Sequence, residues 1–431
     1  MAMTIAHKIL ASHGNVNHVG PGDIVEVSPD VTVVIDQQFT SLQSWPIPTR
    51  ISNPDKLVII LDHNVPASTL NDAEGHKRAR EFAKKFGVAN FYDVGRQGIC
   101  HQVILEEALV LPGQILACSD SHTIGSGVFN CLARGLGAPE ILQLVCTGRT
   151  WFRASPTVKF VLEGSLPLGV AAKDLFLFIA GRFGSVEGHD VEFSGPGLVS
   201  LGMEDRSTLA TMCAEISADF ATFPSDVVLR DYLTSIGSAA GSPVFSDPDV
   251  AYAAVHTVNM NELEPFIGLP GSLPNNVVPI STVRDVKIDQ AFVGSCANGK
   301  LRDLREAADV VRGEHVAPGV RFIVTPGSQA VYLEALRRGY VETLIEAGAL
   351  VTNATCGACF GGGMGLLADG EVCISSSTRN FKGRMGSGNA QIYLASSATV
   401  AASAIAGVIC SPGRPTSGAP RETIDAANEK S

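Results

Sequence analysis

The chain has 431 residues, of which 45% are hydrophobic and 17% charged, and its formal net charge is −11. This length exceeds what one hydrophobic core supports, so we expect two or three domains, and the acidic balance argues against a nucleic-acid surface, which needs clustered Lys and Arg. Ten cysteines are too sparse for a disulfide scaffold, and the start has no apolar signal segment, so we predict a cytoplasmic enzyme.

Apolar runs alternate with helical patterns along the chain, which predicts an α/β fold with layered sheets. We expect strands at 57–61, 115–118, 158–162 and 322–324, and helices at 72–86, 207–220 and 301–312. The nearly uncharged run 393–409 is too short and too weakly apolar for a membrane span, so we predict a buried helix that packs through small side chains. We divide the chain into α/β domains at 1–155, 156–280 and 281–410, followed by a loose tail at 411–431.

Histidines stand beside acids where the predicted strands end. Asp62 and His63 follow the strand at 57–61, Asp120 and His122 follow the strand at 115–118, and His101 lies between the two. A carboxylate fixes the imidazole tautomer and raises its pKa, which makes the ring a competent proton donor near neutral pH. One such histidine is more often structural, but three at strand-to-loop junctions favour chemistry, because α/β folds bind ligands there.

Three cysteines suggest a metal centre. Cys356 and Cys359 form a Cys-x-x-Cys pair followed by three glycines after one intervening residue, and Cys296 lies 60 positions upstream. A [4Fe–4S] cluster that transfers electrons takes four cysteines, so three would leave one iron open to act as a Lewis acid. A structural zinc or a redox dithiol remains an alternative for these residues. The other seven cysteines are predicted to be buried free thiols.

Two arginines follow the Cys-x-x-Cys pair. Arg379 and Arg384 lie five positions apart around a glycine, and guanidinium groups can bind carboxylates in a bidentate manner that lysine cannot. A pair of surface arginines explains this spacing equally well.

Taken in order, these segments resemble the aconitase superfamily, and most closely the large subunits of 3-isopropylmalate dehydratases. The resemblance is collinear over almost the whole chain. It is carried by 4–10, 61–66, 98–102, 120–123, 147–151, 293–298, 356–359, 379–384 and the Ala- and Ser-rich helix near the end.

The resemblance implies three α/β domains packed around one [4Fe–4S] cluster per subunit, held by Cys296, Cys356 and Cys359. It also implies a hydro-lyase that reversibly dehydrates and rehydrates a 2-hydroxy diacid. The implied catalytic residues are Asp62, His63, His101, Asp120, His122 and Glu215, and the implied substrate-binding residues are Ser121, Arg379 and Arg384.

Within this set, the resemblance pairs His101 with the aspartate Asp62 and makes Glu215 the carboxylate that orients His122. An Asp-paired histidine such as His63 would deliver the proton that turns the departing hydroxide into water, while the open iron and the arginines would stabilise the negative charge of the carbanion.

In the family, a swivelling domain supplies the serine base and a further arginine. The chain shows no segment that matches this domain, so we expect a separate small subunit that carries the base and closes the site.

The substrate is left open between 3-isopropylmalate, in leucine biosynthesis, and homoaconitate or another 2-hydroxy diacid such as a methylated malate or a citrate-like acid. Three departures from the family pattern bear on this choice: Thr378, Ala297 and Lys300. A non-catalytic or RNA-binding aconitase-like protein is the less favoured interpretation, since the key residues are present and the chain is acidic.

Overall fold

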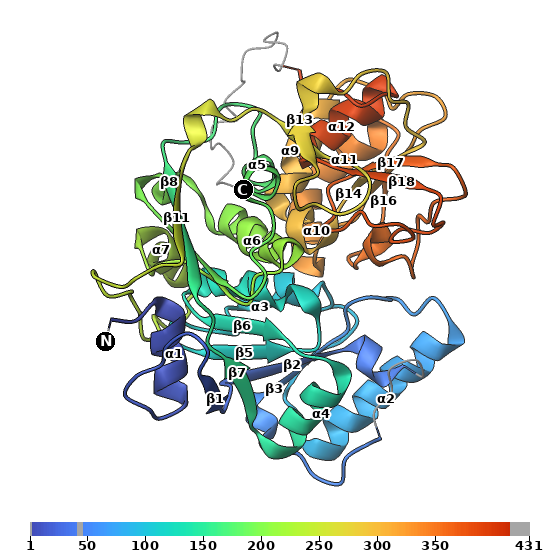
Figure 1. Ribbon diagram of the computed structural model, residues 1–431. Helices are drawn as coiled ribbons and strands as arrows, with labels where there is room; N and C mark the ends of the chain where they lie inside the picture. The colour runs from blue at the N-terminus through green and yellow to red at the C-terminus, as the bar shows by residue number, and fades with distance from the viewer. Residues whose placement is uncertain (1, 41–45, 414–431) are drawn as a thin grey trace, which may run out of the picture.

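The computed structural model describes residues 2–40 and 46–413, so the predicted loose tail lies outside the described residues from position 414 onward. Three large sheets with packed helices form a triangle in Figure 1, with the first sheet at the bottom, the second at the upper left and the last at the upper right. This is the predicted α/β architecture. Within the described ranges, none of the helices combines the length and the apolar character that crossing a membrane requires.

The first sheet has five parallel strands in the order β4-β3-β2-β5-β6. The strands are β2 (Val31–Ile35), β3 (Leu57–Ile60), β4 (Asn90–Tyr92), β5 (Ile115–Cys118) and β6 (Leu132–Gly135), and the helices are α1 (Ile5–His13), α2 (Leu70–Phe86), α3 (Cys100–Glu107) and α4 (Ala138–Thr147). All residues of β3 and β5 are buried, as in a parallel sheet covered on both faces. The strand order reverses between β2 and β5, which is where open parallel sheets bind ligands.

The second sheet has four parallel strands in the order β10-β9-β8-β11. Its elements are β8 (Thr157–Glu163), α5 (Ala172–Phe183), β9 (Asp190–Ser194), α6 (Met203–Met212), β10 (Ala221–Thr222), α7 (Val227–Ser235) and β11 (Ala254–Asn259). An antiparallel pair, β1 (Ile24–Val27) and β7 (Thr150–Arg153), precedes it in the chain.

The predicted helix at 207–220 was wrong at both ends. The helix starts earlier because the Asp205 side chain accepts a hydrogen bond from the N–H of Gly202, which caps the first turn. It stops at Met212, where a 3-10 turn over Cys213–Ile216 follows and Ser217 takes a left-handed conformation with φ 62°.

The last sheet has seven strands in the order β13-β12-β18-β17-β14-β15-β16. Its strands are β12 (Phe266–Gly268), β13 (Val277–Pro279), β14 (Gln290–Val293), β15 (Arg321–Val324), β16 (Leu350–Val351), β17 (Val372–Ser375) and β18 (Gln391–Leu394), and its helices are α8 (Ser295–Asn298), α9 (Leu301–Val311), α10 (Gln329–Arg337), α11 (Tyr340–Glu346) and α12 (Ser397–Ala406). The strands from β18 to β16 are parallel, and the order reverses between β14 and β17.

Two expectations about this last sheet need correction. The sheet takes in β12 and β13 through antiparallel pairing, although both strands precede position 281, where we placed the start of the third domain. The run 393–409 is not one helix, because its first residues complete β18 and the helix α12 begins only at Ser397. The small side chains of α12 are buried as predicted.

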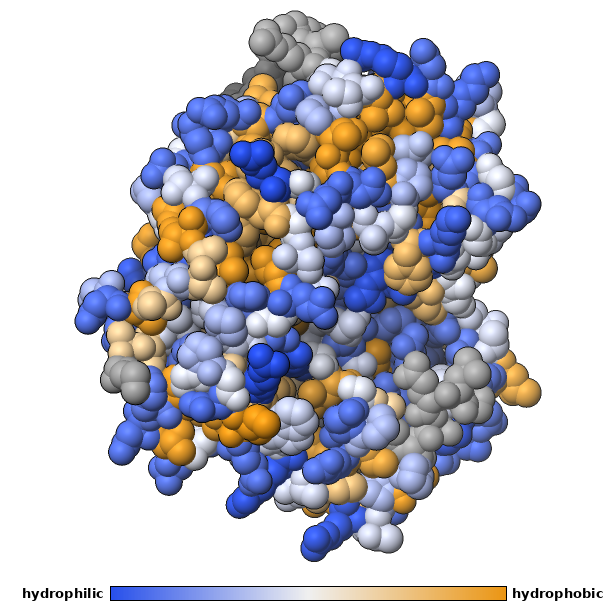
Figure 2. Space-filling view, viewed as in Figure 1, coloured by the Kyte–Doolittle hydropathy of each residue, from blue (hydrophilic) through white to orange (hydrophobic). Residues whose placement is uncertain are grey.

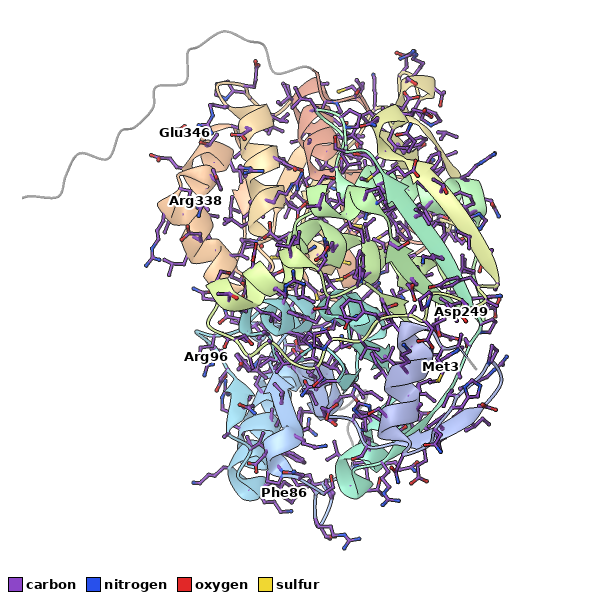
Figure 3. All side chains as sticks on the ribbon, turned by 90° about the vertical axis from the view of Figure 1, so that its left-hand side faces the viewer. Met3, Phe86, Arg96, Asp249, Arg338 and Glu346 are labelled. Carbon is purple, nitrogen blue, oxygen red and sulfur yellow. The ribbon has the colours of Figure 1, made fainter. Side chains whose placement is uncertain are left out.

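One hydrophobic core runs through all three sheets. It contains Ile35 from the first sheet, Phe160 and Phe193 from the second, and Phe292 and Leu394 from the last. Figure 3 shows Arg338 and Glu346, near α10 and α11, far from Phe86 at the end of α2. Met3 and Asp249 lie on one side of that view, where the N–H of Met3 donates to Asp247 Oδ2 at 2.8 Å.

Candidate active site

The carboxyl ends of the first and last sheets face each other across one cavity of about 240 Å³. Figure 2 shows a hydrophilic hollow between the part of the surface that carries the last sheet and the part that carries α2. Every predicted site residue except Glu215 lines the cavity. The lining residues are Gln37, Asp62, His63, Ile99, His101, Ser119, Asp120, Ser121, His122, Cys296, Cys356, Cys359, Arg379 and Arg384.

Topology explains why residues so distant in sequence meet here. His63 and His122 follow β3 and β5, which flank β2 beside the reversal of strand order in the first sheet. Cys296 follows β14 and Arg379 follows β17, the two strands at the reversal in the last sheet. Two ligand-binding edges therefore oppose each other.

Cys296, Cys356 and Cys359, called here the cysteine trio, reach the cavity from two segments that follow strands of the last sheet, the short helix α8 after β14 and the turn after β16. The Cys356 thiol donates to Asp62 Oδ1 at 3.1 Å, and Arg384 Nη2 lies 3.8 Å from Cys359 Sγ. All three cysteines are buried free thiols.

The two thiols of the Cys-x-x-Cys pair differ in acidity. Burial and the neighbouring Asp62 carboxylate raise the pKa of Cys356 well above that of a free thiol. Burial would also raise the pKa of Cys359, but the charges on Arg384 and His122 outweigh it and the pKa is lowered. Arg384 therefore favours the thiolate, the form that binds metal.

The donor set fits an iron–sulfur cluster better than a closed zinc site. Three sulfur donors line the cavity and no fourth cysteine among the described residues joins them, whereas structural zinc sites are closed by four ligands. A second set of three donor atoms, on Asp62, His63 and Cys356, lies within 4.8 Å of one another. It mixes oxygen, nitrogen and sulfur, and it shares Cys356 with the trio.

Asp120 links two histidines. His101 Nε2 donates to Asp120 Oδ1 at 2.6 Å, and the backbone N–H of His122 donates to the same oxygen at 2.8 Å. Burial would raise the pKa of Asp120, but the hydrogen bond and charge of His101 hold it well below the usual range. Our prediction that His101 pairs with Asp62 was wrong, because His101 pairs with Asp120. His101 sits in the first turn of α3 and not at a strand end.

Glu215 does not line the cavity but contacts two residues that do. Its Oε1 atom accepts a hydrogen bond from His122 Nε2 at 2.8 Å and another from Arg379 Nε at 2.8 Å. Arg379 Nη1 also donates to Ser121 Oγ at 3.1 Å. One carboxylate oxygen in the 3-10 turn after α6 thus joins loops of the first and last sheets.

Asp62 and His63 are supported by an acid that our sequence analysis missed. Asp36, at the end of β2, accepts hydrogen bonds from the backbone N–H groups of His63 at 3.1 Å and Asn64 at 3.2 Å. Asp36 Oδ2 also lies 3.6 Å from His76 Nε2. Burial would raise the pKa of Asp36, but His76 and His63 lower it. Asp36 follows a buried strand directly, which is the signal that could have identified it.

Asp62 itself accepts a hydrogen bond from the N–H of Cys100 at 2.8 Å through Oδ2, and its Oδ1 lies 3.3 Å from His63 Nδ1. Burial raises the pKa of Asp62 above its ordinary value. The His63 ring packs edge-on against Phe360, with 4.9 Å between ring centroids. The acid-histidine pair therefore lies directly beside Cys356, with Phe360 packed against the histidine ring.

The three departures from the family pattern lie around the cysteine trio. Lys300 is buried, and its Nζ donates to the carbonyl of Cys296 at 3.1 Å, to that of Ala297, and to Thr208 Oγ1 at 3.0 Å. It therefore braces the loop that carries Cys296. Thr378 is buried with Oγ1 3.9 Å from Cys359 Sγ.

The sequence model of the Aconitase family (aconitate hydratase) matches residues 27–285 and 281–407. The chain belongs to the aconitase family. Dependence on an iron–sulfur cluster is general in this family. The three sulfur donors of the cysteine trio are compatible with such a cluster.

Relatives of this aconitase-family chain match it over nearly its whole length. The 3-isopropylmalate dehydratase large subunit of Mycolicibacterium smegmatis is 54% identical over 409 residues, 95% of this chain and 96% of the relative. The 3-isopropylmalate dehydratase large subunit 1 of Methanopyrus kandleri is 41% identical, over 96% of this chain and 99% of the relative. Among solved structures, holo aconitase X of Thermococcus kodakaraensis matches with a TM-score of 0.50 and 14% identity, over 86% of this chain and 88% of that chain, a likeness of fold alone.

Proposed function

We propose that this chain is the large, cluster-bearing subunit of a hydro-lyase that interconverts 3-isopropylmalate and 2-isopropylmalate in leucine biosynthesis. The observation that carries the proposal is the convergence of the cysteine trio, two acid-histidine sets and two arginines on one cavity. The substrate is taken from the names of relatives that are 54% and 41% identical over almost their full length.

The trio of Cys296, Cys356 and Cys359 would hold one [4Fe–4S] cluster. When bound, such a cluster supplies a Lewis acid that activates the substrate hydroxyl for departure. A reducing compartment suits both this centre and the ten free thiols, so we place the enzyme in the cytoplasm.

The chain's own residues would bind and orient a dianionic substrate. Arg379 is fixed by Glu215 and Ser121, which leaves its Nη2 atom to bind a carboxylate. Arg384 lines the cavity with a buried Nε that has no hydrogen-bond partner among the described residues, so this N–H is a donor in need of an acceptor. Two guanidinium groups suit the two carboxylates of a substituted malate.

His63 is the residue we assign to proton delivery at the departing hydroxyl. Its ring lines the cavity, and its buried Nδ1 lies 3.3 Å from Asp62 Oδ1 and 3.8 Å from Asp36 Oδ1. Both carboxylates lie on the Nδ1 side of the ring. His101 and His122, which share Asp120, are assigned to a second proton-holding position in the cavity.

The relatives' names specify a large subunit, which supports a small partner subunit for this chain. We propose that this partner carries the base that removes the carbon-bound proton and closes the hollow seen in Figure 2. Excluding water from the site strengthens every charge interaction inside it.

The test is co-purification of the chain with candidate small subunits, anaerobic cluster reconstitution, and turnover on a panel of 2-hydroxy diacids. We expect brown protein with about four irons per chain and a preference for isopropylmalate over homoaconitate, methylated malates and citrate. Full turnover by the isolated chain would contradict the need for a partner. A preference for another diacid would favour the second candidate, a homoaconitase-type or related dehydratase.

A further inference from the structure

Lys173, the second residue of α5, is a fully buried cation that our sequence analysis did not single out. Its Nζ donates to the carbonyl oxygens of Ser377 at 2.7 Å and Ser376 at 3.2 Å, and it contacts Met212 Sδ at 3.3 Å. Among the described residues, these hydrogen-bond partners include no carboxylate. A buried charge without a directly paired opposite charge costs several kcal/mol of desolvation, so its surroundings must offset that cost.

The hydrogen-bond partners of Lys173 belong to the two backbone segments that carry Arg379 and Glu215. Ser376 and Ser377 lead directly into Arg379, and Met212 ends α6 three residues before Glu215. Arg379 and Glu215 are themselves joined at 2.8 Å. One ammonium therefore ties together the end of α6 and the loop after β17, immediately behind the Arg379–Glu215 pair.

The charge of Lys173 also interacts with two of the site cysteines, Cys296 and Cys359. Burial lowers the pKa of Lys173 to about 8, and the charges that oppose this fall are, largest first, those on Cys296, Glu215, Cys359 and Asp303. Three of these four charges, on Cys296, Glu215 and Cys359, belong to the site.

We infer that Lys173 is a positioning residue of the site: its ammonium fixes the backbone that presents Arg379 and Glu215, and it supplies positive charge near Cys296 and Cys359. This inference deepens the proposed function and rests on it for the turnover measurement. A neutral side chain at this position lets Arg379 move, so substrate carboxylate binding weakens. It also removes a positive charge that favours the reduced cluster, so the midpoint potential becomes more negative.

The experiment compares Lys173→Met, Lys173→Arg and the control Lys159→Met. Lys159 lies in β8 near Glu192, at 3.8 Å, and Tyr252, and does not line the site cavity. Two quantities are measured: kcat and KM of the reconstituted enzyme with its small subunit, and the midpoint potential of the cluster in the isolated chain, followed by EPR. For Lys173→Met we expect KM to rise about tenfold, kcat to fall less, and the potential to shift to a more negative value.

Lys173→Arg should keep the potential of the unmodified chain, because the charge is retained, and Lys159→Met should match the unmodified chain in both measurements. Unchanged KM and potential in Lys173→Met overturn the inference, and so does a shift of equal size in Lys159→Met. If Lys173→Met changes KM alone, the inferred effect of the Lys173 charge on the cluster is refuted. If it changes the midpoint potential alone, the inferred role of Lys173 in positioning Arg379 is refuted. If Lys173→Met does not fold, Lys173→Gln carries the same measurements, since its amide can still donate to a carbonyl.

The two proposals fail separately. Absence of turnover by the unmodified enzyme on every diacid would refute the proposed function, while the comparison of midpoint potentials would still decide the role of Lys173.

Discussion

Replacing Glu215 with glutamine tests the contact that joins the loops of the site. In the native chain, Oε1 of Glu215 accepts hydrogen bonds from His122 Nε2 and Arg379 Nε, both at 2.8 Å. Burial would raise the pKa of Glu215, but His122 and Arg379 lower it, so the carboxylate is ionised at neutral pH. Glu215→Gln keeps the shape and one acceptor oxygen but removes the charge that both donors share.

The expected magnitude follows from these two bonds. A hydrogen bond to a charged group contributes about 1.5–3 kcal/mol, roughly twice a neutral one. Since the amide oxygen retains part of each bond and the two bonds share one acceptor, we expect a net loss near the value for one charged bond. That loss corresponds to a decrease in kcat/KM of about 10- to 100-fold.

The assay is steady-state turnover of the reconstituted two-subunit enzyme, with iron content measured on the same preparation. Glu371→Gln is the matched control, because Glu371 forms a two-bond pair with Arg321 at 2.7 and 2.8 Å and does not line the site cavity. The control should keep kcat/KM within about twofold, since an exposed ion pair contributes at most ~1 kcal/mol and only to stability. A Glu215→Gln enzyme within threefold of the native kcat/KM, at equal iron content, would refute the reasoning.

Three further outcomes are expected. Asp36→Asn should lower kcat/KM about five- to tenfold at unchanged iron content, measured in the same assay, because a neutral amide binds the N–H of His63 less strongly by ~1–1.5 kcal/mol. Asp226→Asn should lower the free energy of unfolding by about 2 kcal/mol at pH 7, because it leaves the buried Arg206 guanidinium without its bidentate partner, whereas the exposed Asp309→Asn should change it by less than ~0.5 kcal/mol. Burial would raise the pKa of Asp226, but Arg206 lowers it below the unfolded-state pKa near ~4. The stability that the Asp226 carboxylate contributes is therefore fully present above the unfolded-state pKa and is lost as pH falls through the lower folded-state pKa. The free energies of unfolding of the native chain and of Asp226→Asn should therefore converge in acid. Chelating the iron from reconstituted protein should bleach its colour and lower its Tm, because a ligand bound only by the folded state stabilises it, and an unchanged Tm would contradict a cluster inside the fold.

Much of the fold could be predicted because buried parallel strands have a strong local signature. The strand at 115–118 coincides with β5, and the helix at 301–312 differs from α9 by one residue. The meeting of the predicted site residues in one cavity follows from topology, since carboxyl ends of parallel strands lie at one edge. The same rule applied to β2 would also have identified Asp36.

Other features depend on tertiary contacts that the sequence does not announce. The early end of α6 at Met212 places Glu215 in a tight turn between His122 and Arg379, yet the local residues read as a longer helix. The partner of His101 could not be chosen between Asp62 and Asp120 without the geometry of α3. Lys173 at the start of a helix has the local pattern of a solvated residue, and only the packing of three elements around it reveals its burial.

Because the three sheets share one hydrophobic core, we expect that no single sheet with its helices folds as a separate fragment. A fragment ending near position 155 would keep Ile35 but lose the part of this shared core that Phe160 and Phe292 contribute. Such a fragment would expose an apolar surface to water and would aggregate. Chimaeras between relatives should therefore exchange surface loops and not whole sheets with their helices, because the three sheets pack around one shared core.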